Sequence, residues 1–216
     1  MEIFINGQAG LASSDENVKI GELINYMAEE LGKQRMIAQA YTLDGKELNI
    51  QETPGVLERQ ANEFSKLEID VAPFEVVAQN VVGELIQGTI ILGEETVKIT
   101  ELFQKGQLQD ASKRLDIFAD SVVYVIEALK PIIGLSDFAS DTKLKEGKRF
   151  DETLTILLDR ITGLKTSLED KDYATVGDVL EFDIKPSLES LTDAMGMMRV
   201  KLDGMIQALK EERKKA

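Results

Sequence analysis

Carboxylates are the most abundant side chains in this sequence that could do chemistry. The chain carries 39 acidic residues, and close neighbours among them occur at Glu94-Glu95, at Asp116 with Asp120 and at Asp151-Glu152. Such pairs can act as general acid and base or can bind a hard divalent cation. In so acidic a chain neighbouring acids also arise by chance, and solvated helix faces account for them. We therefore expect no catalytic pair and no metal site.

The residue types that are missing argue against an enzyme. The sequence has no histidine and no cysteine, so the commonest general base, the commonest metal ligand and any thiolate nucleophile are absent. It also lacks the phosphate-binding pattern GxxxxGK[ST], a GxGxxG after a strand and the nucleophile elbow GxSxG. We expect a non-enzymatic protein without a cofactor.

The charge limits the partners. A formal net charge of −14 repels the phosphates of nucleic acid and anionic membrane surfaces, so neither is an expected partner. The start MEIFINGQ has no basic segment followed by an apolar one, and no stretch approaches about 18 uninterrupted apolar residues. With no cysteine as well, the sequence favours a soluble, cytoplasmic protein.

The elements that would position any site differ between the two parts of the chain. In the first third, residues 2–6 alternate as a strand that ends at the turn dipeptide Asn6-Gly7. A helix is predicted over 21–31, with Gly32 as its stop, and MIAQAYTL and KEL read as a hairpin joined at Asp44-Gly45. A short helix and a last strand follow, with Leu67, Ile69 and Val71 on one face.

Beyond Pro73 the pattern is almost entirely helical. Phe74, Ala78, Val81 and Leu85 are the expected apolar positions at the start of the first helix, which runs to about Gln104 and ends at Gly106. Pro131 with Gly134 closes the second. Pro186 predicts a kink or break in the last helix. Apolar residues three and four apart form a seam on each of the three later helices: Leu108, Ala111, Leu115, Phe118, Val122, Val125 and Leu129; Phe150, Leu154, Leu157, Ile161, Leu164 and Leu168; Leu188, Leu191, Met195, Met198, Leu202, Met205 and Leu209.

These patterns predict an α+β protein of two domains, residues 1–73 and 74–216. The stripes of the second domain bury best as an antiparallel four-helix bundle. Two of its links are short, whereas residues 134–148 form a longer polar link that we expect to cross one end of the bundle.

Two features of the helical region could serve binding. Methionine adapts its shape to apolar partners, and Met195, Met197 and Met198 lie close together on one helix. In the alternative interpretation Met195 and Met198 fill the seam. The first helix is rich in small residues such as Gly83, Gly88 and Gly93, which indicates either close packing or a loosely held helix that a partner could displace.

Residues 1–73 resemble a ubiquitin-like β-grasp domain. The likeness rests on the order of the elements and on MEIFI at the start, ENVK before the helix, LDGKEL in the hairpin and KLEIDV as the last strand. About a dozen residues separate Gly7 from Ile20, so the second strand of that fold must be short or irregular here. The resemblance implies a protein-binding module that uses the face of its sheet.

Residues 74–216 are similar in pattern to the helical export chaperones that bind flagellin. The stretch that carries this likeness is ELFQKGQLQDASKRLDIFADSVVYVIEAL. The resemblance implies a chaperone-like role without assigning binding residues.

The sequence therefore favours a protein-binding adaptor or export-chaperone-like protein whose partner is another protein or an amphipathic peptide. The candidate binding residues are Met195, Met197 and Met198 on the bundle and Ile37, Tyr41 and Leu43 on the sheet. The alternative is a self-assembling scaffold, because helical seams can also pair between chains and would then give at least a homodimer.

Overall fold

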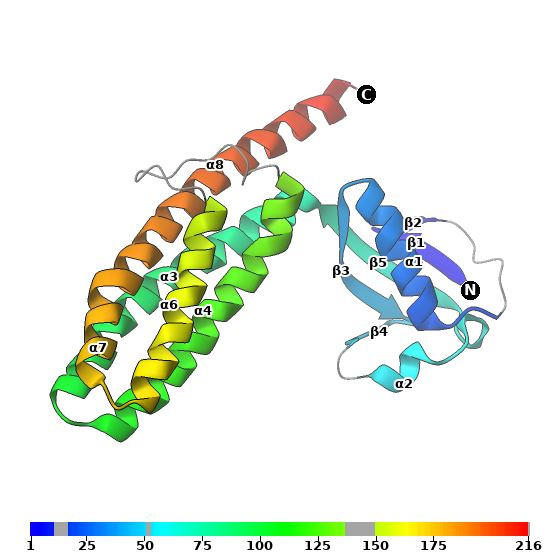
Figure 1. Ribbon diagram of the computed structural model, residues 1–216. Coiled ribbons are helices and arrows are strands. Elements are labelled where there is room, and N and C mark those ends of the chain that lie inside the picture. The colour runs from blue at the N-terminus through cyan, green and yellow to red at the C-terminus, as the bar shows by residue number, and fades with distance from the viewer. Residues whose placement is uncertain (11–16, 51–52, 137–149, 216) are drawn as a thin grey trace. The chain divides into compact units, whose positions relative to one another are not determined.

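The computed structural model describes residues 1–10, 17–50, 53–136 and 150–215 (Figure 1). The described chain forms two compact units, Met1–Val77 and Ala78–Ala216, each of which is described by itself below. The first holds a mixed sheet with a helix and the second is largely helical, so the chain is an α+β protein. The long polar link predicted at 134–148 lies mostly outside the described residues.

The strands described in the first unit form one sheet in the order β2-β1-β5-β3-β4. β1 and β5 run parallel, and the other neighbouring pairs are antiparallel. The bounds of the strands are β1 Glu2–Ile5, β2 Gln8–Ala9, β3 Met36–Leu43, β4 Lys46–Glu47 and β5 Lys66–Pro73. β2 has only two residues, as the short spacing after Gly7 predicted.

Two asparagine- or aspartate-glycine turns make the hairpins. Asn6-Gly7 and Asp44-Gly45 both adopt positive φ at each position, the conformation that the tightest hairpin turns require. The Asp44 carboxylate also accepts hydrogen bonds from the backbone N–H groups of Ser65 and Lys66, at 3.0 and 2.8 Å. The predicted turns are thereby confirmed, and the second ties β3 to the start of β5.

One helix covers one face of this sheet. α1 (Ile20–Lys33) buries the predicted stripe of Ile20, Leu23, Ile24, Met27 and Leu31 against the sheet residues Ile3, Leu43, Leu67, Ile69 and Val71. The predicted stop at Gly32 is wrong, because the helix continues to Lys33 and the residue with positive φ is Arg35. The carboxylate of Glu75 lies 2.8 Å from Nε and from Nη2 of the Arg35 side chain. The shorter helices α2 (Pro54–Leu57) and η1 (Ala61–Glu63) lie between β4 and β5 in the chain.

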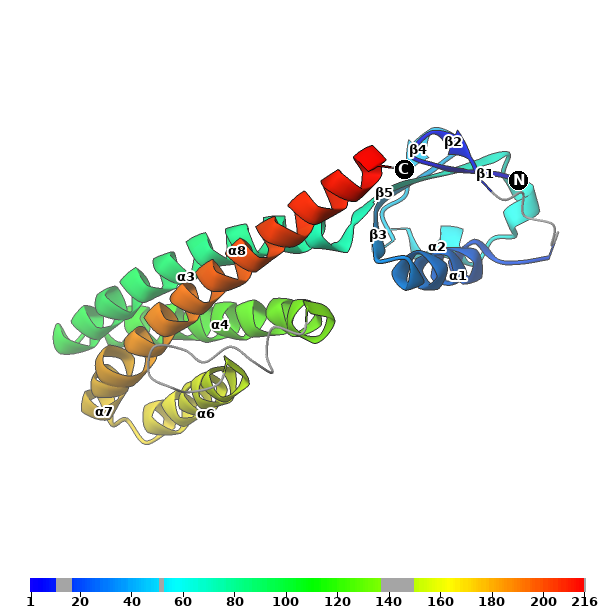
Figure 2. The ribbon, with the colours of Figure 1, turned by 90° about the horizontal axis from the view of Figure 1, so that it is seen from above.

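The helices of the second unit are α3 (Phe74–Gln104, whose first residues belong to the first unit), α4 (Leu108–Ser136), α6 (Phe150–Glu169), α7 (Tyr173–Asp178), η2 (Val179–Ile184) and α8 (Lys185–Lys215). Figures 1 and 2 show α3, α4, α6 and α8 side by side. An ion pair between Arg114 and Glu95 joins α4 to α3, and Gln79 of α3 donates a hydrogen bond to Asp203 of α8. Arg160 of α6 lies 3.5 Å from Asp183 of η2. Together with the packing of α6 against α4, these contacts link the helices in a ring.

The buried seam of α3 differs from the expected one. It consists of residues alternately four and three apart: Ala78, Val82, Leu85, Thr89, Leu92, Thr96, Ile99 and Phe103. Two threonines occupy seam positions, and their hydroxyls donate to backbone carbonyls of their own helix, Thr89 to Leu85 at 2.7 Å and Thr96 to Gly93 at 2.8 Å. A threonine can therefore be buried here without a partner on another helix.

The prolines interrupt the helices less than predicted. α4 does not end at Pro131 but continues to Ser136, and Pro131 lies on the exposed side, where water can bond the carbonyl that the proline leaves without a donor. Ahead of Pro186 the chain does not break. It forms the wider π-helical turns of η2 between α7 and α8, where the Lys185 N–H donates to the carbonyl of Leu180, five residues before it.

Among the described residues, α3 is a helix long and apolar enough to cross a membrane by length and composition. The same test is passed by core helices of soluble proteins. The regular three-and-four spacing of its buried residues fits a helix that packs against other helices along one side.

Candidate functional site

A groove runs along the second unit between α3 and the continuous stretch formed by α7, η2 and α8. It consists of three adjoining cavities of about 370, 150 and 400 Å³, which share Thr100, Gln104 and Glu181 at one junction and Val97 and Lys185 at the other. We call it the α3–α8 groove; residues between 89 and 104 of α3 and between 173 and 193 of the opposite wall line it. At 1.5 Å per residue the α3 wall is about 22 Å long.

The α3 wall lies beside the buried seam. Positions 90, 93, 97, 100 and 104 fall along one flank of the helix, next to the seam that faces the core. Ile90 and Val97 on this flank remain 45% and 43% exposed although both are apolar. Gly93 adds no side chain between them, and among the described residues nothing lies within 4 Å of where its Cβ would be. Small residues and an over-wide apolar stripe together leave the groove open.

The π-helical turns shape the opposite wall. η2 carries Glu181 on the groove side, and Lys185 and Leu188 follow in the first turn of α8. Gly177 of α7 brings the backbone close to α3, where a Cβ would stand 3.5 Å from the Thr100 methyl group. Widened helical turns of this type are often found at functional sites.

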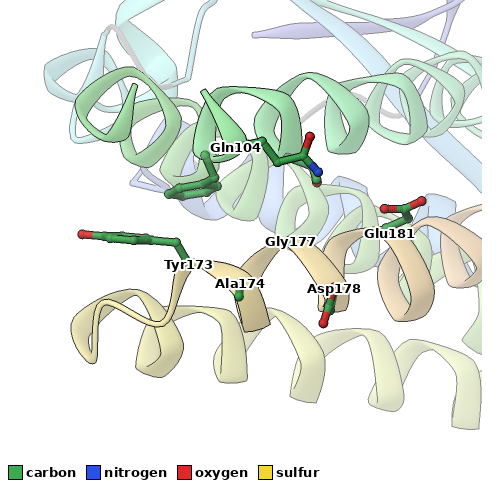
Figure 3. A pocket seen from close by; sticks show the side chains of 8 residues that line it. Gln104, Tyr173, Ala174, Gly177, Asp178 and Glu181 are labelled. Atoms are coloured by element: carbon green, nitrogen blue, oxygen red, sulfur yellow. The ribbon is translucent and has the colours of Figure 1, made fainter. Parts of the chain in front are cut away.

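An aromatic pair closes one end of the groove. The rings of Phe103 and Tyr173 stack with centroids 5.4 Å apart and planes inclined by 20°. Figure 3 shows Tyr173 at this end, with Gln104 of α3 and Glu181 of η2 reaching from opposite walls into the space between them. Toward the other end Gln79 bonds Asp203, and Arg199 Nη1 lies 4.0 Å from where a Cβ of Gly83 would be, so the two helices approach each other there.

Thr100 contributes a buried hydroxyl without a partner. The residue is 8% exposed and lines two of the three cavities, and its Oγ1 makes no hydrogen bond within the described part of the chain. A buried hydroxyl in this state costs about 1 to 3 kcal/mol. The wall of the groove is therefore not optimised for the stability of the free protein.

The rim of the groove is acidic. Its lining residues include the carboxylates of Glu94, Glu101, Asp178, Glu181, Glu189 and Asp193, and Lys185 is the base among them. Lys105 donates a 2.8 Å hydrogen bond to Glu101 and holds the pKa of that carboxyl below its usual value. The groove therefore has an acidic edge around an apolar floor.

The other acidic pairs singled out in the sequence serve different roles. Glu95 does not line the groove but contacts Arg114 and Lys98. Burial acts to raise the pKa of Glu95, but the hydrogen bonds and charges of these two cations outweigh burial and lower the pKa. Asp116 and Asp120 lie exposed on α4. No group of three acids that could hold a metal ion lies among the described residues.

The three methionines predicted to bind a partner lie on different sides of α8. Met195 and Met198 are fully buried at seam positions of α8, so neither can touch a partner while the helices stay packed. This is the arrangement of the alternative interpretation. Met197 is 49% exposed but is not among the groove residues. A binding role for these residues remains a prediction.

The three predicted sheet residues do not share a face. Leu43 is buried under α1, and Tyr41 packs against the same core, where burial raises the pKa of its phenol. Ile37 pairs with Ala72, on the opposite face of the sheet, because the register shifts between Ala38 and Ala40. That face also carries Phe4, with the Lys66 ammonium 4.5 Å above its ring. Of the three, Ile37 lies on the face that α1 leaves open.

The groove itself was missed in the sequence. A signal for it exists on α3. Ile90 and Val97 are seven residues apart, as are their neighbours Thr89 and Thr96, so the two pairs lie along two adjacent lines of the helix surface. The opposite wall gives no such signal. Tyr173, Gly177 and Glu181 lie before Pro186, where the sequence predicted a kink or break and not one continuous wall.

The fold and the groove thus define a two-part protein with a mixed sheet unit and a helical unit that carries a candidate binding site. Comparison with known families adds two matches: the TP0873 N-terminal domain over residues 1–73, and a domain of unknown function, DUF8042, over residues 80–194. The chain belongs to the DUF8042 family. All the residues that line the α3–α8 groove fall within the region that this family model matches.

A curated relative shows the same extent. An uncharacterized protein of Treponema pallidum (strain Nichols) is 22% identical over 200 residues, which cover 90% of this chain and 96% of the relative. The match therefore spans both units. No solved structure matches the chain.

Proposed function

We propose that this chain is a non-enzymatic, cytoplasmic protein-binding adaptor or chaperone whose helical unit holds a segment of another protein in the α3–α8 groove. The observation that carries the proposal is the groove itself. It leaves Ile90 and Val97 partly exposed along a channel about 22 Å long, and apolar grooves between helices commonly receive a helix from a partner. The scarcity of catalytic residue types supports binding over chemistry.

In this proposal the first unit is a ubiquitin-like β-grasp domain and the second an antiparallel four-helix bundle. The strand order β2-β1-β5-β3-β4, with β1 and β5 parallel in the centre and α1 across one face, supports the first assignment. The ring of contacts that joins α3, α4, α6 and α8 supports the second. The open sheet face with Ile37 would then offer a second, separate surface for a protein.

A photo-crosslinking experiment tests the proposal. The chain contains no cysteine, so a cysteine introduced at Val97 can be labelled uniquely with a benzophenone maleimide. The matched control is a cysteine at Tyr124 of α4, which is 69% exposed and outside the groove. In lysate of the native cell, illumination should give one discrete adduct from position 97 and much less from position 124. Equal yields of the same adducts at both positions would contradict the groove as the binding site.

A self-assembling scaffold is the second candidate, and one observation favours it. Ile117 and Tyr124 of α4 are 60% and 69% exposed and lie seven residues apart on the side of the helix that faces away from the core. A dimer through this side would appear as twice the chain mass in light scattering, and the benzophenone at position 124 would then crosslink two copies of the chain. A monomer at high concentration would refute it.

A further inference from the structure

We propose that the occupant of the α3–α8 groove is an amphipathic helix whose polar face is basic. This inference rests on the proposed function and adds the chemistry of the partner. It follows from three properties of the groove: its length, the apolar side chains along it and the sign of the charges at its edges.

The length and shape fit one helix. The α3 wall, from residue 89 to residue 104, is about 22 Å long, which corresponds to about four turns. Ile90 near one end of the α3 wall and Val97 at its middle offer exposed apolar contacts, and Phe103 with Tyr173 bounds the other end. A partner helix with apolar residues three and four apart would cover these side chains along one stripe.

The charges select the sign of the partner's polar face. Carboxylates stand on both edges, Glu94 and Glu101 on α3 and Glu181 and Glu189 on the opposite wall. A helix that lies between them brings the flanks of its apolar stripe close to these acids, where lysine and arginine are attracted and glutamate is repelled. The net charge of −14 would steer a basic segment toward the protein as a whole, and the groove adds apolar contacts that match the segment's apolar stripe.

Synthetic peptides provide the test with the full chain. The probes are three fluorescein-labelled 16-residue helical peptides that share one leucine stripe and carry lysine, glutamine or glutamate at all other positions. Fluorescence anisotropy measures their affinity at about 50 mM and about 500 mM NaCl. The lysine peptide should bind saturably and about tenfold or more tightly than the glutamine peptide at the lower salt, and the difference should shrink at the higher salt, where screening is strong.

Matched variants locate the binding. The double variant Glu94→Lys with Glu189→Lys reverses one exposed charge on each edge of the groove. The control, Asp116→Lys with Asp120→Lys, makes the same change in net charge on the exposed side of α4. The groove variant should lose about tenfold in affinity for the lysine peptide, and the control should lose about twofold or less. Circular dichroism of each variant confirms that it is folded.

Each contrary outcome has a distinct meaning. Equal losses in the two variants would show general attraction to an acidic protein and would overturn the inference. Equal affinity for the lysine and glutamine peptides would also overturn it, while leaving the groove as an apolar binding site. If no peptide binds although position 97 still crosslinks to a protein, the inference fails and the proposed function stands. If neither binding nor crosslinking occurs, both fail.

Discussion

Replacing Gly88 or Gly93 of α3 by alanine should stabilise the protein. In the interior of a helix glycine is less favourable than alanine by about 1 kcal/mol, because the unfolded chain loses more freedom on folding. A Cβ at either position would meet no described atom within 4 Å, so no steric cost offsets this gain. We expect each variant to raise the free energy of unfolding by about 0.5 to 1 kcal/mol, and the double variant by roughly the sum.

Gly106, which follows α3, is the matched control. A Cβ there would also meet nothing among the described residues, but its φ of +72° belongs to the left-handed region that alanine avoids. The Gly106→Ala variant should therefore lower the free energy of unfolding by about 1 kcal/mol. Because the free space is the same at all three positions, the sign of the change depends on the backbone alone.

Urea unfolding followed by circular dichroism at 222 nm measures these differences, since the signal comes mainly from the helices. A stability change of 1 kcal/mol also shifts Tm by about 2 to 4 °C in a chain of this size. The result that would refute the reasoning is a loss of stability in Gly88→Ala or Gly93→Ala. It would mean that these glycines permit a close helix approach, the packing alternative that the sequence left open.

Three further changes have predictable directions. Thr100→Val should raise the free energy of unfolding by about 1 kcal/mol in urea titrations, because it removes a buried hydroxyl without a partner; Thr100→Ser, which keeps the hydroxyl, should not. Burial raises the pKa of Tyr41, so its contribution to stability is present below the ordinary tyrosine pKa and is lost as pH rises through the folded-state value; Tyr41→Phe should reduce the alkaline fall in Tm. The side-chain and backbone groups of Thr175 donate to Asp172 at the start of α7 and lower its pKa, so this contribution is present above the ordinary aspartate pKa and is lost as pH falls through the folded-state value. Thermal melts of Asp172→Asn, whose side chain still caps but does not titrate, should show a smaller loss of Tm in acid.

The elements that the sequence predicted well are those in which one local pattern determines the structure. The stripe of α1 is buried residue for residue, because five apolar positions at helical spacing face a sheet that needs a cover. Asp44-Gly45 forms the expected turn, because few residue pairs tolerate positive φ at both positions. In both cases the determinant lies within a few residues of the element that it fixes.

The predictions that fail are those for which contacts with a second, distant segment determine which residues are buried. Ile37 and Tyr41 were predicted to share a binding surface, but the register shift near Ala40 places them on opposite faces of the sheet, and alternation within β3 alone does not reveal a bulge. On α3 the sequence favoured Val81 as a seam residue, whereas Val82 is buried. Threonines replace aliphatic residues at two later seam positions, and the apolar pattern of that helix is too diluted to fix its register.

The groove could not be predicted for a related reason. Its walls are more than 60 residues apart in the sequence, and its floor consists of flank positions that a helical wheel assigns to solvent.

The residues of the groove show where the fold departs from tight packing. Thr89 and Thr96 satisfy their hydroxyls within α3, Thr100 does not, and Gly93 leaves space beside the exposed Val97. A segment that fills this space would bind the folded chain and not the unfolded one. At a free concentration of 100 times its Kd, it would add about 2.7 kcal/mol to the free energy of unfolding. The lysine peptide should therefore raise the Tm of the unmodified chain, and this rise should be absent in the Glu94→Lys, Glu189→Lys variant. Such a result would indicate that the incompletely packed groove is the binding site.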